Sequence, residues 1–404
     1  MERPARLVAL MCTAEVLSMT GFSAYPAYLP GLRAAWHMSG AQAGFVGGAF
    51  FFGYMMAVPF LSGITDRIDA RSVFAASCGV AALGTAGFAL LARGTATGAL
   101  FQALTGAGLA GTYMPGLKAL TDRAPGTQQG RTVAFYTASF GIGTSVSLAL
   151  AGWLAAALPW RLAFAALALG PLLALPLVLL RLPRLPAPDA PHASRWPRLR
   201  GVLAQSEVRR YVLGYAAHCW ELFGLRSWMV AFVATAAAVS GSACPWMNAT
   251  DISALINLLG LPASVLGNEM AVRVGRLRWI FSVMVCAAAL SWLAGLSLAA
   301  PWWIVLPLLA AYFVCVMADS AALTAGLVAA APASQRGAAL AVYSLLGFGA
   351  GFVAPVLFGT TLDAAGGKPF GWALALATLS AAGLIWAGAS RRARSPATPH
   401  GRLR

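Results

Sequence analysis

Twelve apolar stretches of about twenty residues each occupy most of this 404-residue chain. A helix of that length crosses the hydrocarbon core of a bilayer, and backbone groups in hydrocarbon must be paired within the segment, so each stretch is expected to be helical. They lie at about 7–29, 41–61, 73–92, 98–120, 132–156, 161–180, 211–236, 252–272, 279–299, 302–330, 338–361 and 370–390. The sequence therefore predicts an all-α membrane protein with twelve transmembrane helices.

Charge is scarce and unevenly placed. Only 10% of the residues are charged, against about 25% in soluble domains. If the N-terminus is cytoplasmic, 23 Lys and Arg residues fall in cytoplasmic segments and four in external ones. This bias predicts that both termini are cytoplasmic, and we expect a bacterial inner membrane. The net charge of +16 follows from the loops, so a nucleic-acid partner is not expected.

An internal repeat divides the chain. The segment 124–136 reappears as 331–343, with six of thirteen positions identical at a constant offset of 207. Between the copies, residues 181–210 carry five prolines and seven arginines, which forbid membrane insertion. We predict a six-helix bundle at 1–180, a cytoplasmic linker at 181–210, a pseudo-symmetric six-helix bundle at 211–390 and a cytoplasmic tail at 391–404. Two parallel repeats of this kind are typical of one transporter architecture.

The loop between the second and third stretches completes a family resemblance. It reads Ser62-Gly-Ile-Thr-Asp66-Arg67-Ile-Asp69-Ala70-Arg71 and is similar to the signature Gly-x-x-x-Asp-Arg-x-Gly-Arg-Arg of the major facilitator superfamily (MFS). Asp66, Arg67 and Arg71 match it, while Ser62, Asp69 and Ala70 depart from it. The resemblance covers essentially the whole chain and implies an ATP-independent secondary transporter that works by alternating access.

The resemblance also implies a gate. The gating residues would be Gly63, Asp66, Arg67, Arg71 and Asp122. Asp66 would sit at the N-terminus of the eleventh span, where a helix macrodipole favours a carboxylate, and Arg71 would pair with Asp122. Span 11 carries Gly347, Gly351 and Pro355, a composition that indicates tight packing or a bend.

Four ionisable residues lie inside predicted spans, where charge is costly and usually faces a polar cavity. These are Glu15, Glu221, Arg226 and Asp319, and the resemblance places all four on cavity-lining spans. His218 and Glu221 are three residues apart on one helical face and can share a proton. For Arg226 the candidate partner is Asp319. Tyr25, Tyr28, Tyr136, Trp228 and Tyr343 are further candidates to line the cavity, although membrane aromatics more often serve packing.

We hypothesise that Arg226 binds a small organic anion or carboxylate, because its planar fork suits a carboxylate. Glu221 and Asp319, with His218 and Glu15, would carry coupled protons. A second hypothesis is export of cationic or amphipathic compounds at the three acids. Gln102, where the family has a proton-coupling arginine, and the segment Ser147–Gly152, which lacks the family's proline, speak against it.

Other classes of protein find less support. The chain has no metal-ligand spacing and no nucleotide-binding or nucleophile motif, so we expect no enzyme activity, no metal and no cofactor. A transporter-like sensor stays open as a non-transport alternative. The expected partners are a small-molecule substrate, membrane lipid and protons, and the expected functional unit is a monomer.

Overall fold

The computed structural model describes residues 4–124, 129–186, 199–332 and 335–392, and all regular structure in these ranges is helical. The first seven helices are α1 (Pro4–Ser18), α2 (Ala24–Ala35), α3 (Gly40–Ile64), α4 (Ala70–Leu91), α5 (Thr95–Thr121), α6 (Gln129–Ala157) and α7 (Trp160–Arg181). The remaining helices are α8 (Leu199–Ala204), α9 (Ser206–Ser240), α10 (Ala249–Val274), α11 (Arg276–Leu296), α12 (Trp302–Met317), α13 (Ser320–Ala330), α14 (Arg336–Ala364) and α15 (Pro369–Arg392).

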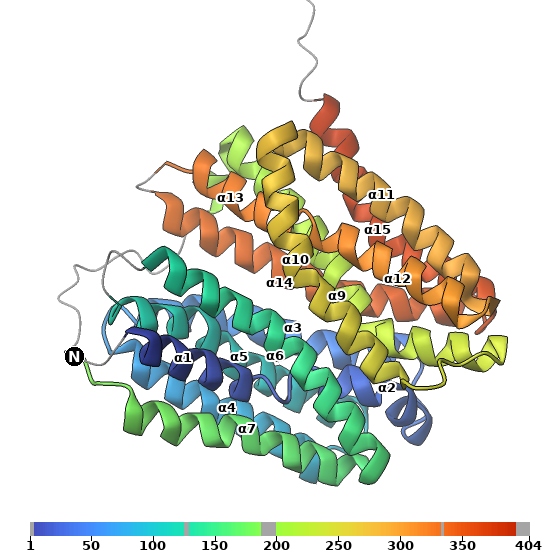
Figure 1. Ribbon diagram of the computed structural model, residues 1–404, viewed down its shortest axis with the longest axis horizontal. Helices are drawn as coiled ribbons and strands as arrows, with labels where there is room; N and C mark the ends of the chain where they lie inside the picture. Colours follow the sequence, from blue (N-terminus) through green and yellow to red (C-terminus); the bar gives the residue numbers. More distant parts are fainter. Residues whose placement is uncertain (1–3, 125–128, 187–198, 333–334, 393–404) are drawn as a thin grey trace, which may run out of the picture.

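The helices form two groups that lie side by side along the long axis of the molecule (Figure 1). The blue-to-green helices α1–α7 make up one half, and the yellow-to-red helices α9–α15 make up the other. The expected linker 181–210 is partly helical, because α8 and the start of α9 fall within it. Its residues 187–198 lie outside the described part of the chain, as does most of the expected tail, 393–404.

Ten helical segments of the described chain are long and apolar enough to cross a membrane. The first predicted span is missing from them because it is broken into α1 and α2 at residues 19–23. Helix α5 is long enough, but its threonines and glycines lower its apolarity. The predicted tenth span contains a break between α12 and α13 at Ala318 and Asp319. The count of twelve stays a prediction, while the all-helical membrane fold is confirmed.

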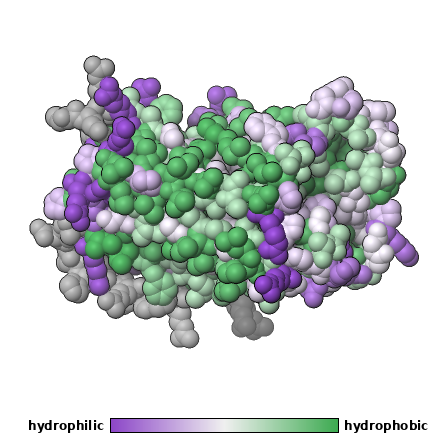
Figure 2. Space-filling view, turned by 90° about the horizontal axis from the view of Figure 1, so that it is seen from below, coloured by the Kyte–Doolittle hydropathy of each residue, from purple (hydrophilic) through white to green (hydrophobic). Residues whose placement is uncertain are grey.

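Apolar side chains cover the outside of the helices. On α7, Leu169, Leu172, Leu173 and Leu180 are between 52% and 80% exposed. Figure 2 shows hydrophobic residues spread over the middle of one face, with hydrophilic residues gathered toward the ends. An apolar surface of this extent is stable only against lipid, so the helices run across the membrane rather than along its surface.

The two halves meet unequally along their length. We call the end where α7 ends and α9 begins the linker end, and the opposite end, where α3 begins and α14 ends, the far end. At the far end α3 and α14 are in backbone contact: a Cβ on Gly44 would lie 2.0 Å from the Pro355 carbonyl oxygen, and one on Gly48 would lie 2.3 Å from that of Phe352. At the linker end, a Cβ on Gly63 or on Gly337 would meet nothing within 4 Å. The halves are therefore joined at the far end and apart at the linker end.

Candidate functional site

A small cavity of about 20 Å³ lies between the two halves, near the middle of the molecule. Helices α2, α3, α5 and α6 line it from one half, and α9 and α10 from the other. A space of this size holds about one water molecule. Its polar lining residues are Ser23, Gln102, Thr144, Arg226, Ser227 and Asn257, and its aromatic ones are Phe22, Tyr25, Phe50 and Phe51.

Arg226 supplies the only charge in this lining. Its Nε donates a hydrogen bond to Asn257 Oδ1 at 2.8 Å, and its guanidinium carbon lies 5.7 Å from the centre of the Phe313 ring. Within the described residues it has no carboxylate partner. The expected pairing with Asp319 is wrong in this structure, because Asp319 pairs elsewhere. The side chain is half-buried and borders the cavity, and a cation at this depth without a counter-charge is ready for an anionic ligand.

Gln102 faces the same cavity from the opposite half. Its side chain is 3% exposed, and it makes no hydrogen bond within the part of the chain that the structure describes. Its amide borders the cavity and is free to bond a ligand there. The sequence offered Gln102 only as a departure from the family's arginine, and its role in the cavity was missed.

The remaining polar side chains of the cavity already have partners in the protein. Tyr25 Oη donates to the Ala43 carbonyl at 2.9 Å, and Ser227 Oγ donates to the Phe223 carbonyl at 2.8 Å. Thr144 Oγ1 donates to the Phe140 carbonyl at 3.0 Å, and Ser23 Oγ to the Thr144 carbonyl at 3.4 Å. The unused hydrogen-bond donors among the described lining residues are thus on Arg226 and Gln102, while the hydroxyls can still accept.

The two intramembrane acids of the second half each face one polar partner. Asp319 Oδ1 lies 2.7 Å from His218 Nδ1, at ion-pair distance although the ring N–H is not aligned for a hydrogen bond. Both side chains are at least 96% buried. Glu221 Oε1 accepts a hydrogen bond from Tyr312 Oη at 2.8 Å. His218 therefore meets Asp319 rather than Glu221, the partner that sequence spacing favoured.

Glu15 is fully buried in the first half. Its Oε2 lies 2.9 Å from Tyr136 Oη, and the same hydroxyl lies 2.8 Å from the Thr112 carbonyl oxygen. Its Oε1 has no hydrogen-bond partner among the described residues. Glu15 and Glu221 are thus alike in facing a tyrosine hydroxyl from another helix. The halves differ, however, because Tyr343, the repeat equivalent of Tyr136, bonds Thr324 Oγ1 at 2.9 Å and stacks on Tyr215.

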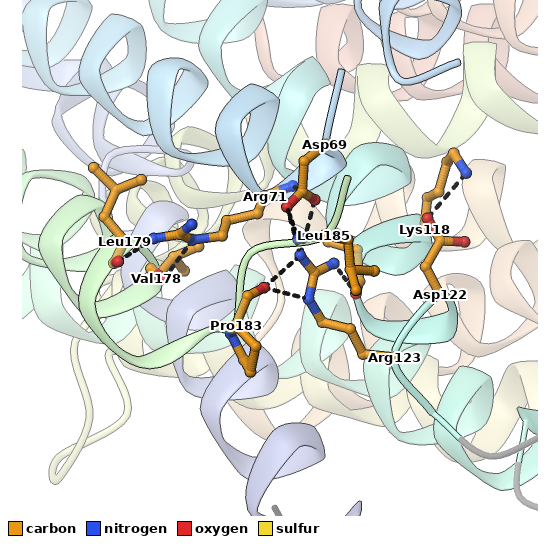
Figure 3. Close-up of polar contacts among 10 residues, drawn as sticks. Asp69, Arg71, Lys118, Asp122, Arg123, Val178, Leu179, Pro183 and Leu185 are labelled. Atoms are coloured by element: carbon orange, nitrogen blue, oxygen red, sulfur yellow. Dashed lines mark hydrogen bonds and ion pairs between the residues drawn. The ribbon is translucent and has the colours of Figure 1, made fainter. Parts of the chain in front are cut away.

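At the linker end, the loop between α3 and α4 is built around Asp69, a residue that departs from the family signature (Figure 3). Asp69 caps α4 by accepting from the Arg71 backbone N–H at 3.0 Å. Its carboxylate also pairs with Arg123 at 2.7 Å and accepts from the Leu185 N–H at 2.8 Å. Burial alone would raise the pKa of Asp69, but the hydrogen bonds from Arg123, Leu185 and Arg71 outweigh it and lower that pKa.

The expected pair of Arg71 and Asp122 is absent from this structure. The Arg71 guanidinium instead donates to the carbonyls of Val178 and Leu179 at the end of α7. Asp122 pairs with Lys118, one turn back on α5, at 3.0 Å. The buried ion pair of this loop is instead that of Arg123 with Asp69. From the sequence, Arg123 was predicted only as a loop charge, and its guanidinium also donates to the Pro183 carbonyl.

The other gating candidates are exposed. Gly63, Asp66 and Arg67 all lie on the open linker end, and the carboxylate of Asp66 has no hydrogen bond or ion pair within the described residues. The predicted contact of Asp66 with the start of the eleventh span is therefore not formed in this conformation. Gly347 and Gly351 lie where α14 packs on α9, since their Cβ atoms would meet the rings of Tyr215 and Phe223 at 2.5 Å. Pro355 lies where α14 touches α3.

At the far end, Asp363 joins the halves. This residue at the end of α14 accepts from the backbone N–H groups of Gly40 and Ala41, at 2.7 and 2.8 Å. These are free donors at the N-terminus of α3, where a carboxylate is favoured by the helix macrodipole. Arg33 adds a contact of 3.6 Å to the same carboxylate. No sequence pattern predicts this contact, because the bonded residues are 322 and 323 positions apart in the chain.

A family model described as Major Facilitator Superfamily matches residues 11–355. No curated protein matches the sequence. Among solved structures, a bacterial homologue of the human lysosomal transporter Spinster superimposes with a TM-score of 0.76. It is 14% identical in sequence, covering 95% of this chain and 95% of that one, and is described as inward-facing and unoccupied.

Two further solved structures share the fold. The nucleoside transporter NupG has a TM-score of 0.74 and 13% identity over 96% of this chain and 100% of that one. The POT family transporter PepTSo has a TM-score of 0.72 and 15% identity over 98% of this chain and 100% of that one. Identities this low establish a shared fold and leave the substrate to the residues of the site.

Proposed function

Since the chain belongs to the Major Facilitator Superfamily and is a transporter of the secondary kind, we propose that it moves a small organic anion together with protons. The observation that carries this proposal is Arg226. It is the one charged side chain in the cavity between the halves, and no carboxylate of the described chain neutralises it. A substrate carboxylate would supply the missing counter-charge, and Asn257 holds the guanidinium in place for it.

Proton coupling is assigned to the buried acids beside the cavity. Asp319 with His218, Glu221 with Tyr312, and Glu15 with Tyr136 are each held by one partner that can both donate and accept a proton. A carboxyl group held by such a partner keeps a hydrogen bond whether it is protonated or ionised, although the net charge of the pair changes by one. Their contacts tie helices together, so a change of protonation would also alter packing within each half.

Alternating access is the proposed mechanism. The far end is closed by the backbone contact of α3 with α14, and the halves are apart at the linker end. The excess of Lys and Arg in the linker-end loops favours a cytoplasmic linker end. The conformation would then be open to the cytoplasm, in keeping with the inward-facing description of the Spinster homologue.

The cation-export alternative loses support from the same geometry. None of the three acids lines the cavity, and each faces a protein partner. A sensor without transport would bind the ligand but show no flux. Uptake into proteoliposomes therefore separates the sensor from the transporter.

The experiment that tests the proposal is a thermal-shift screen of purified protein against small carboxylates and lipophilic cations. A ligand at about 100 times its dissociation constant stabilises the folded state by about 2.7 kcal/mol. We expect carboxylates to stabilise the parent and the exposed-loop control Arg93→Ala, and to have no effect on Arg226→Ala. Stabilisation by cations that survives Arg226→Ala would contradict the proposal, as would unchanged carboxylate affinity in Arg226→Lys.

A further inference from the structure

We infer that the substrate is a monocarboxylate with an aromatic body, bound by Arg226 at its carboxylate and by Gln102 at one further polar group. This inference rests on the proposed function and names its substrate class. It follows from which groups around the cavity are already satisfied and which are not.

The charge of the site fits one carboxylate. The Arg226 Nε is taken by Asn257, so the edge formed by its two terminal nitrogens is left for the ligand. Two parallel N–H groups on that edge match the two oxygens of one carboxylate. With no other cation in the lining, a second carboxylate would be buried unpaired. The site therefore selects monoanions over dianions.

The walls fit an aromatic body. Phe22 and Phe50 meet edge to face at 5.1 Å, and Phe50 meets Phe51 in the same way at 5.4 Å. Phe51 in turn stacks on Phe223 from the other half at 4.2 Å. Phe22, Phe50 and Phe51 line the cavity, so its apolar wall is built from aromatic rings. A guest ring can replace such ring-to-ring contacts, whereas an aliphatic chain gains only its apolar area.

The lining offers few hydrogen-bond donors to polar substituents of a ligand. Apart from Arg226, only Gln102 has unused hydrogen-bond donors among these lining residues, since the hydroxyls of Tyr25, Ser23, Thr144 and Ser227 donate their protons to backbone carbonyls and can only accept. A nucleoside carries more hydrogen-bond acceptors than these donors can serve, and polar groups buried without partners are rejected strongly. The site thus accepts one polar substituent and excludes nucleosides.

The cavity must widen before it takes such a ligand, because about 20 Å³ holds only a water molecule. Its position makes widening possible. Gln102 and the phenylalanines of α3 belong to one half, and Arg226 and Asn257 to the other. A movement of one half relative to the other changes the distance between these groups. The substrate would therefore contact both sets of residues when the halves approach each other.

The test compares ligand affinities of purified, detergent-solubilised protein, measured by thermal shift and by isothermal titration. The probes are benzoate, cyclohexanecarboxylate, acetate, phthalate and the uncharged nucleoside uridine. We expect benzoate to bind about tenfold or more tightly than acetate and cyclohexanecarboxylate, a factor that corresponds to about 1.4 kcal/mol, and phthalate and uridine not to bind. The variant Phe22→Leu should lose the preference for benzoate over acetate while it still binds acetate. The matched control Phe164→Leu, a buried ring on α7 that packs on Phe88, should keep that preference.

The outcomes separate this inference from the proposed function. Equal affinity for benzoate, cyclohexanecarboxylate and acetate, each lost in Arg226→Ala, would overturn the aromatic class and leave anion transport standing. Binding of phthalate or uridine in preference to benzoate would also overturn the inference. Binding of none of the carboxylates by a monodisperse parent protein would overturn both. Gln102→Leu gives a second readout, since it should abolish any gain in affinity from benzoate to 4-hydroxybenzoate.

Discussion

Tyr136 has one hydroxyl proton and two acceptors, Glu15 Oε2 at 2.9 Å and the Thr112 carbonyl at 2.8 Å. If Glu15 is ionised, Tyr136 donates to it; if Glu15 is protonated, Glu15 donates to Tyr136, which then donates to Thr112. The hydroxyl therefore supports both protonation states of a fully buried carboxyl group. At the scale of single residues, this relay is the feature of the first half that most resembles a proton site.

We predict that Tyr136→Phe destabilises the protein by about 1–3 kcal/mol, because the buried Glu15 carboxyl group loses the Tyr136 hydroxyl as a hydrogen-bond partner. The matched control is Tyr343→Phe at the equivalent position of the repeat. Its partner Thr324 is exposed and keeps its own bond to the Ser320 carbonyl, so the loss should stay below about 1 kcal/mol. Thermal unfolding of both variants in detergent checks this. A smaller loss for Tyr136→Phe than for Tyr343→Phe would refute the relay.

The ion pair of Asp69 with Arg123 gives a second residue-scale prediction. Its side chains are only 7% and 4% exposed, so Arg123→Ala should destabilise by roughly 3–5 kcal/mol. The comparison is Asp122→Asn, which removes an exposed pair on one helix worth about 0.3–0.5 kcal/mol. Equal losses of stability in the two variants would show that the buried pair is not structural.

The lowered pKa of Asp69 sets the pH dependence of that pair. A carboxyl group whose folded-state pKa is depressed stabilises the fold fully above its unfolded-state pKa, here near 3.8, and loses this contribution as pH falls toward the folded-state pKa. The difference in stability between the parent and Asp69→Asn should therefore be constant from about pH 5 to 7 and shrink below about pH 4. A difference that grows on acidification would contradict the assignment.

At the scale of helices, apolar length and periodic composition were enough to predict most elements. The predicted stretch 41–61 falls inside α3, and 161–180 falls inside α7. The break between α1 and α2 was not predicted. It is stabilised by other helices: the Thr20 hydroxyl donates to the Leu167 carbonyl on α7, and the Ser23 backbone N–H donates to the Ser147 hydroxyl on α6. A helix can end inside the membrane only where other helices supply such partners, and a sequence does not show which helices will be near.

The contact of α3 with α14 depends on glycine. We predict that Gly44→Ala separates the two helices at the far end, because its Cβ would lie 2.0 Å from the Pro355 carbonyl oxygen and overpacking costs about 1–3 kcal/mol. Spin labels on cysteines at Ala34 and Lys368, with the six native cysteines replaced, report the distance across this end. It should lengthen in Gly44→Ala and stay unchanged in Gly337→Ala, where the added Cβ meets nothing within 4 Å.

At the scale of the whole molecule, the sequence predicts which charged residues lie inside the membrane, but it does not predict which residues they contact. Glu15, Glu221, Arg226 and Asp319 can be recognised from the sequence alone, because a charged residue inside an apolar stretch is costly in lipid and usually has a function. Their partners depend on how each helix is rotated and which helix faces it. The sequence spacing paired His218 with Glu221, because both lie on α9. In the structure His218 instead contacts Asp319, which lies between α12 and α13. Gln102 carries no charge, so the sequence marked it only as a departure from the family's arginine and not as a residue of the cavity.

Each end of the molecule has one aspartate, Asp363 or Asp66, that can bond the N-terminus of a helix of the other half. Asp363 on α14 caps the N-terminus of α3 and holds the far end closed. Asp66, at the end of α3, is exposed in this conformation and is predicted to contact the start of α14 only when the linker end closes. Each carboxylate would thus stabilise one state and be free in the other. Removing either one should shift the balance between the states in opposite directions.

We therefore predict that Asp363→Ala favours opening of the far end and Asp66→Asn favours the observed state. A contact of this kind, partly exposed, contributes about 1–2 kcal/mol, which is a population change of roughly 5- to 30-fold. The label pair at Ala34 and Lys368 should show more of the long distance in Asp363→Ala, less in Asp66→Asn, and a distribution close to the parent's in the double variant. Asp122→Asn, which alters a pair within one helix, serves as the control and should leave the distribution unchanged. Shifts in the same direction for Asp363→Ala and Asp66→Asn would show that the two carboxylates do not act on one equilibrium, because a two-state exchange that closes one end must open the other.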